Sequence, residues 1–210
     1  MEKRELLHIV VATIGIALIG SFALLLQGNG EALPRYCVYA VLIMGAYSGV
    51  RKLVAHALDA GVEHELWTME RFGLKPNHYL KAPAPLGMIF PFFCTLFSAG
   101  FAKVTTFLTY EVRANKYRAA KRFGYYSHTA ISDWHNALIG AAGIGATLIL
   151  ALIAYFINAE PLAKLATYHA VTNMIPFSKL DGTQIFFGSR VLYTSLALIT
   201  FVCFVYALRL

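Results

Sequence analysis

Charged residues are scarce in this sequence. Asp, Glu, Lys and Arg make up only 14% of its 210 residues and hydrophobic residues make up 58%, whereas a soluble domain carries about 25% charged residues. The charge-free stretches are 6–30, 36–50, 82–102, 136–159, 165–178 and 191–208. Segregation on this scale excludes an ordinary soluble globule and a disordered chain, and it predicts an integral membrane protein.

Cysteine is also rare. Cys37, Cys94 and Cys203 all lie in apolar stretches and show neither CxxC nor zinc-finger spacing. Their odd number and their spacing exclude a disulfide framework. The net charge of +7 does not indicate nucleic acid binding, because Lys and Arg gather in the cytoplasmic loops of membrane proteins. We expect the lipid bilayer, and no nucleic acid, as a partner.

The apolar pattern predicts an all-α integral membrane protein that forms a single domain over residues 1–210. About five transmembrane helices are expected, at 6–26, 36–58, 136–158, 161–176 and 191–208. Segment 82–102 contains Pro83, Pro85 and Pro91, and three prolines so close together do not suit a regular spanning helix. We expect this segment to be re-entrant or interfacial, since irregular backbone within a membrane needs shelter inside protein.

The polar segments complete the predicted topology. Residues 62–72 read as a polar amphipathic helix, and residues 103–135 as a basic cytoplasmic segment whose part at 113–122 is helical. If the N-terminus is cytoplasmic and 82–102 does not cross, most Lys and Arg lie on the cytoplasmic side, as membrane insertion favours. The small size and the unpaired cysteines are compatible with a prokaryotic plasma membrane, which is the location we expect.

One motif carries information about function. Residues 173–182 contain the pattern N-x-x-P-x-x-x-L-D-G, and the fixed positions are Asn173, Pro176, Leu180, Asp181 and Gly182. An acid near the membrane suggests a functional site, although a helix end with a proline stop and an Asp-Gly turn also explains these residues. The pattern resembles the second signature of the site-2 protease family of intramembrane zinc metalloproteases. The resemblance implies that Asp181 is the third zinc ligand and that Asn173 lies near the active site.

The family places an H-E-x-x-H motif on an earlier membrane helix, where two histidines bind zinc and the glutamate activates water. This sequence contains no H-E-x-x-H. The family's helix typically continues as K-x-x-A, and aligning residues 52–55 with that ending places the motif at residues 47–51. Tyr47 and Arg51 then stand at the two histidine positions and Ser48 at the glutamate position. Arg51 would place a cation where the metal should bind.

A second alignment stays open. His64 and Glu65 keep the first histidine and the glutamate, with Thr68 at the second histidine position, but they lie in a polar segment. A rebuilt metal site would use His64 or His56 together with Asp181, and Glu65 would be its catalytic base. The first alignment is the one that we favour.

These observations give three functional hypotheses. The first is a pseudoprotease of the site-2 protease type, which binds a transmembrane segment or partner protein without cleaving it and holds no cofactor. The second is an active intramembrane zinc metalloprotease with a rearranged metal site. The third is a small transporter or channel subunit, which the absence of paired ionisable groups within the spans and of repeats in both halves disfavours.

Overall fold

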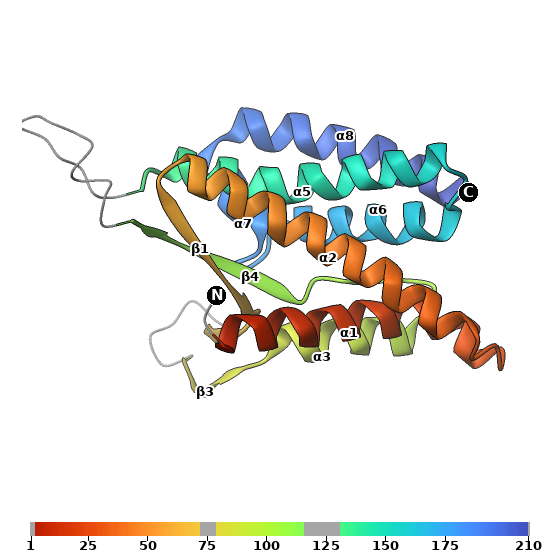
Figure 1. Cartoon of the computed structure of the whole chain (residues 1–210). Coiled ribbons are helices and arrows are strands. Elements are labelled where there is room, and N and C mark those ends of the chain that lie inside the picture. Colours follow the sequence, from red (N-terminus) through yellow and green to blue (C-terminus); the bar gives the residue numbers. More distant parts are fainter. Residues whose placement is uncertain (1–2, 72–78, 116–130, 210) are drawn as a thin grey trace, which may run out of the picture.

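The computed structural model describes residues 3–71, 79–115 and 131–209, and it is mostly helical (Figure 1). The helices are α1 (Lys3–Leu26), α2 (Ala32–Ala57), α3 (Leu86–Phe97), α5 (Asp133–Phe156), α6 (Glu160–Met174), α7 (Asp181–Gly188) and α8 (Arg190–Arg209). The strands are β1 (Ala60–Leu66), β2 (Met69–Arg71), β3 (Tyr79–Ala84) and β4 (Leu108–Ala114). The all-α prediction holds for the bulk of the chain, with four short strands added at one end.

Four helices, α1, α2, α5 and α8, are long and apolar enough to cross a membrane, judged by length and composition. They cover four of the five predicted spans. The fifth, expected at 161–176, is the 15-residue helix α6. At 1.5 Å per residue it is about 22 Å long, which is less than the ~30 Å of a bilayer core. Ten of its residues are buried, so it lies within the bundle.

The helices form two groups (Figure 1). Helices α5, α6 and α8 stack on one another, α1 and α3 lie side by side, and α2 runs obliquely between the two groups. The main core forms where α1, α2 and α6 meet, and buried side chains such as Ile16, Ile43 and Leu165 pack there. The outer face of α8 exposes large apolar side chains, including Leu198 and Phe201, as expected of a helix that faces lipid.

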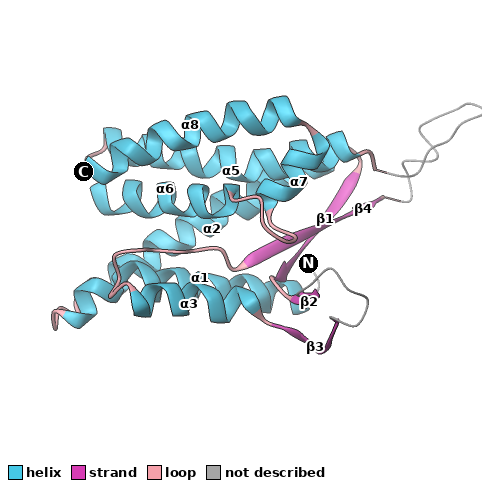
Figure 2. Ribbon diagram, turned by 180° about the vertical axis from the view of Figure 1, so that it is seen from behind, coloured by secondary structure: helices cyan, strands magenta, loops and turns pink. Residues whose placement is uncertain are grey.

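Segment 82–102, predicted to be re-entrant or interfacial, contains the 12-residue helix α3, which includes Pro91. Helix α3 starts beside the first turns of α1 and runs in the same direction as α1 (Figures 1 and 2). Gly100, after the end of α3, lies against Ala23 near the end of α1, where an added Cβ would stand 3.0 Å from Ala23. The chain then returns in extended form to β4. The segment thus comes back to the end of the bundle from which it entered.

The polar segment after α2 is a strand, so the predicted helix at 62–72 is wrong. β1 pairs antiparallel with β4, and Val62, His64 and Leu66 lie opposite Val112, Tyr110 and Leu108. The alternation of V-E-H-E-L places every second side chain on one face, as a strand requires. The helix predicted for 113–122 is also wrong at its start, because Arg113 belongs to β4. The rest of it, from residue 116 onward, lies outside the described residues.

Candidate functional site

A buried ion pair joins α2 to α7 at the centre of the structure. Nη2 of Arg51 donates a hydrogen bond to Oδ2 of Asp181, and both side chains are 0% exposed. Tyr47, one turn before Arg51 on the same face of α2, donates its hydroxyl hydrogen bond to the same carboxylate oxygen at 2.6 Å. The three positions that the favoured alignment assigns to the metal ligands therefore meet at one point.

Aromatic rings and a glycine enclose the guanidinium group. The Cζ atom of Arg51 lies 4.0 Å from the ring centre of Tyr47 and 4.3 Å from that of Tyr110 on β4, which are distances for cation–π attraction. On the third side stands Gly143 of α5, where an added Cβ would lie 2.6 Å from Nη2 of Arg51. Four elements, α2, β4, α5 and α7, thus close around one cation.

The glycines of α5 provide a test of this packing. We expect Gly143→Ala to displace the guanidinium of Arg51 and to lower the free energy of unfolding by about 1–3 kcal/mol, as overpacking of a core does. Gly145→Ala is the matched control on the same helix, because nothing lies within 4 Å of its Cβ position. It should be neutral or stabilising, since alanine is the better helix former by up to about 1 kcal/mol. Thermal unfolding in detergent measures both, and equal effects of the two changes would contradict the packing.

The other residues of the N-x-x-P-x-x-x-L-D-G motif have structural roles around Asp181. Asn173 is buried and donates a hydrogen bond from Nδ2 to the carbonyl of His169 at 2.9 Å. Pro176 follows Ile175, the C-cap residue of α6, and Leu180 is the N-cap residue of α7. An added Cβ on Gly182 would stand 2.1 Å from the carbonyl oxygen of Met174. The motif therefore builds the tight corner between α6 and α7 that carries Asp181 inward.

A second polar cluster surrounds Glu5 of α1. Its Oε1 accepts from Nζ of Lys52 at 2.6 Å and lies 3.0 Å from Nδ1 of His64, whose side chain is 0% exposed. Burial lowers the pKa of His64 to about 4, and the charge of Arg51 adds to this effect, so the ring is neutral at pH 7. The cluster ties α1 to α2 and β1.

The lowered pKa of His64 makes stability depend on pH. The unfolded chain takes up a proton on this residue near pH 6.5, whereas the folded protein does so only near pH 4. Stability is therefore present above pH 6.5 and falls as the pH drops towards 4, by at most about 3 kcal/mol. We expect the Tm of the wild type to fall between pH 7 and pH 5 by more than that of His64→Gln. An equal fall in both proteins would show that His64 is not the titrating group.

The remaining predicted site residues do not join the ion pair. His56 is exposed at the end of α2, Glu65 is exposed on β1, and Ser48 donates its hydroxyl to the carbonyl of Met44. Within residues 3–71, 79–115 and 131–209, no three His, Cys, Asp or Glu side chains are arranged to hold a metal ion. The structure thus does not bring His56, His64 and Glu65 together with Asp181 into a rebuilt site.

The residues at the convergence point do not fit the zinc ion that the resemblance implies. The Asp181 oxygen that would bind a metal already accepts hydrogen bonds from Arg51 and Tyr47. Arginine stays protonated in proteins and offers no lone pair, so its charge repels a divalent cation. A single carboxylate beside a guanidinium is not a zinc donor set.

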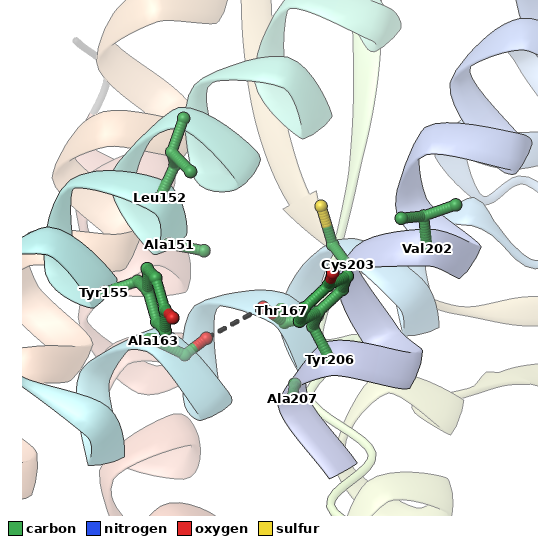
Figure 3. Close-up of a pocket in the computed structure, with 9 residues that line it drawn as sticks. All are labelled: Ala151, Leu152, Tyr155, Ala163, Thr167, Val202, Cys203, Tyr206 and Ala207. Atoms are coloured by element: carbon green, nitrogen blue, oxygen red, sulfur yellow. Dashed lines mark hydrogen bonds between the residues drawn. The ribbon is translucent and has the colours of Figure 1, made fainter. Parts of the chain in front are cut away.

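Two pockets lie near this centre and differ in character. A polar pocket of about 540 Å³ lies between β4, the start of α5, and α7, and its charged lining residues are Glu65, Glu111, Asp133 and Lys179. An apolar pocket of about 260 Å³ lies between α5, α6 and α8 (Figure 3). The hydroxyl of Thr167 in the apolar pocket is bonded to the carbonyl of Ala163. Of these two pockets, the polar one is lined by charged residues and the apolar one is not.

Sequence reasoning missed two members of these clusters, Tyr110 and Glu5. Tyr110 stands in the alternating segment L-T-Y-E-V-R, and that alternation is the signal that would have placed it on the inner face of a strand. Glu5 immediately precedes the first apolar stretch. An acid buried at such a position needs a cation or a hydrogen-bond donor beside it. The sequence did not indicate that Lys52 and His64 would be the residues that contact Glu5.

The chain was compared with protein-family models, with curated proteins and with solved structures. The resemblance to the site-2 protease family rests on the sequence pattern of residues 173–182. None of the three comparisons gave a match.

Proposed function

We propose that this protein is a membrane pseudoprotease of the site-2 protease type, which binds a transmembrane segment or a partner protein without cleaving it. The observation that carries the proposal is the convergence of Tyr47, Arg51 and Asp181 at one buried point. These are the positions that the resemblance assigns to metal ligands. In this chain an ion pair occupies that point and holds α2 and α7 together.

The polar pocket beside the ion pair supports a binding role. Residues 109–112 of β4 line it, and among the described residues β4 pairs only with β1. An extended segment can add to such a strand edge through main-chain hydrogen bonds. The side chain of Gln184 donates to the carbonyl of Tyr110 at 3.2 Å, so this carbonyl faces away from β1, and an added segment would take the place of Gln184.

The pocket also favours one charge of partner. Its lining carries three acids, Glu65, Glu111 and Asp133, against one base, Lys179. A membrane protein whose spanning segment continues into a basic stretch would match this charge. Such a stretch is common on the cytoplasmic side of membrane proteins, which is the side on which we place this end of the bundle.

Two measurements on the full-length protein test the proposal. In the first, metal analysis of the purified wild type should find no stoichiometric zinc. One zinc per chain that is lost in Asp181→Ala would overturn the pseudoprotease and support the active metalloprotease.

The second measurement uses vesicles that contain the protein and a panel of fluorescent transmembrane peptides, with and without basic flanks. We expect energy transfer with the basic peptides, and no cleavage with or without a chelator. Glu111→Gln with Asp133→Asn should weaken this transfer, whereas Glu31→Gln at the opposite end of the bundle should not. Cleavage that a chelator blocks, or no association with any peptide, would contradict the proposal.

A further inference from the structure

Two cavities share the helix pair α1 and α3. The first, which we term the head pocket, has a volume of about 440 Å³ and is lined by residues that include Arg4, Glu5, His8, His64, Glu65 and Pro85. The second, which we term the tail groove, has a volume of about 330 Å³ and is lined by residues that include Leu18, Phe22, Ile89, Phe92, Phe93 and Leu96. One cavity is polar and the other is apolar.

The two cavities follow one another along the same direction. The head pocket lies at the start of both helices, and the tail groove lies farther along both. From Glu5 to Leu18 the rise of α1 is about 20 Å. This is about two thirds of the ~30 Å thickness of a bilayer core. Helix α3 runs beside α1 in the same direction (Figure 2). A polar pocket at one end and an apolar groove farther along the helices match a lipid, which has a polar headgroup at one end of its apolar chains.

The tail groove faces the surroundings of the bundle. Ile89 and Phe93 are each 55% exposed and Leu96 is 65% exposed. Their helix packs against α1, a helix long and apolar enough to cross a membrane. An apolar groove of this kind, open along spanning helices, is in contact with acyl chains.

The head pocket holds one cation and one anion that have no ion-pair partner among the described residues. Arg113 and Glu63 pair with one another at 3.0 Å, and Glu5 is held by Lys52. Arg4 and Glu65 remain, and both are exposed. The pocket therefore matches a ligand that carries both a negative and a positive charge.

Two histidines, His8 and His64, are also among the residues that line the head pocket. In the described part of the chain, Nε2 of His64 and Nδ1 of His8 have no hydrogen-bond partner. His64 is fully buried and directs Nδ1 at Glu5, so in the neutral ring Nε2 is an acceptor. Both nitrogens are shielded from the surroundings, so the groups that the head pocket offers to a ligand are the exposed side chains of Arg4 and Glu65.

We propose that the head pocket and the tail groove bind one phospholipid with a primary-amine headgroup, of the phosphatidylethanolamine type. Its phosphate binds Arg4, and its ammonium group binds Glu65. One acyl chain lies in the tail groove. A phosphatidylcholine headgroup has no N–H donor for Glu65, and a phosphatidylglycerol headgroup has no cation for it, so the site discriminates against both. The lipid site does not rest on the proposed pseudoprotease function, although Glu65 lines both the head pocket and the polar pocket; Arg4 lines the head pocket and not the polar pocket, so its variant tests the lipid site by itself.

Native mass spectrometry and thermal unfolding of the full-length, delipidated protein in a mild detergent test the proposal. Phosphatidylethanolamine, phosphatidylcholine and phosphatidylglycerol with identical chains are added in turn. We expect phosphatidylethanolamine to bind about tenfold more tightly than the other two and to raise the Tm the most. Arg4→Gln should weaken phosphatidylethanolamine binding about tenfold, and Glu65→Gln should remove the preference over phosphatidylcholine.

Matched controls and a groove variant make the test specific. Arg35→Gln and Glu31→Gln change an exposed cation and an exposed acid at the opposite end of the bundle, and they should leave lipid binding unchanged. Leu18→Trp fills the tail groove and should weaken all three lipids alike. Equal binding of the three lipids by the wild type would overturn the proposal, as would effects of Arg4→Gln and Glu65→Gln equal to those of their controls. Binding of soluble glycerophosphoethanolamine as tight as that of the lipid would refute the tail groove.

Discussion

Arg51→Met is expected to lower the free energy of unfolding by about 3–5 kcal/mol, because it leaves the carboxylate of Asp181 buried without its counter-charge. Both side chains are 0% exposed, so water cannot replace the lost partner. The hydrogen bond from Tyr47 at 2.6 Å compensates only in part for the missing cation. Thermal unfolding in detergent should show a Tm lower by roughly 10 °C.

A double variant separates the buried charge from the loss of packing. Asp181→Asn together with Arg51→Met removes both charges and keeps an acceptor for Tyr47. We expect the pair to recover most of the stability that either single change loses, since replacing both members of a buried ion pair is often neutral. Arg35→Met, at an exposed position of the same helix, should change stability by no more than about 0.5 kcal/mol. Losses that simply add in the double variant would show that the two side chains do not act as a pair.

The second large effect is a gain of zinc binding. The triple variant Tyr47→His, Ser48→Glu and Arg51→His writes an H-E-x-x-H sequence into α2 and removes the cation from Asp181. Positions 47 and 51 already direct their side chains at the same carboxylate oxygen. An imidazole is shorter than a phenol or a guanidinium, which leaves space for an ion with bonds of about 2.0–2.2 Å to nitrogen and oxygen. We expect the triple variant to bind about one zinc per chain and the wild type none.

The controls for this gain use the same background. Adding Asp181→Asn to the triple variant removes the charged ligand and should lower zinc affinity by at least tenfold. Adding Glu65→Gln should change nothing, because Glu65 is exposed on β1 and does not join the ion pair. A triple variant that folds but holds no zinc would be evidence against the alignment that places the metal ligands at Tyr47, Arg51 and Asp181. Far-ultraviolet circular dichroism establishes that it folds.

Several features of the fold were predictable from the sequence. The long apolar stretches predicted four of the helices, because burial of about 20 apolar residues in a bilayer needs no tertiary information. The prolines of 82–102 predicted an interrupted segment, and the structure has there the 12-residue helix α3, with Pro91 inside it. The strands were mispredicted because the short segment 62–72 fits a helical pattern as well as an alternating one, and only pairing with β4 decides between them.

The candidate site divides in the same way. The motif around Asp181 and the cation at Arg51 were both visible as residues, because a charge within an apolar chain is conspicuous. Their direct contact was not visible, since 130 residues separate them and no local rule relates α2 to α7. The role of Gly143, which leaves space for the guanidinium of Arg51, likewise could not be predicted, because it depends on the packing of α5 against α2.

The scarcity of charge by itself predicted several long apolar helices of a length compatible with a membrane, because the composition of a segment decides whether it can be buried in an apolar solvent. It also marked Arg51 and Asp181 as exceptions in need of an explanation. Only the tertiary structure decided that Arg51 and Asp181 form an ion pair with one another. A buried charge is tolerated where another element brings its counter-charge within bonding distance, and that proximity depends on how the helices pack.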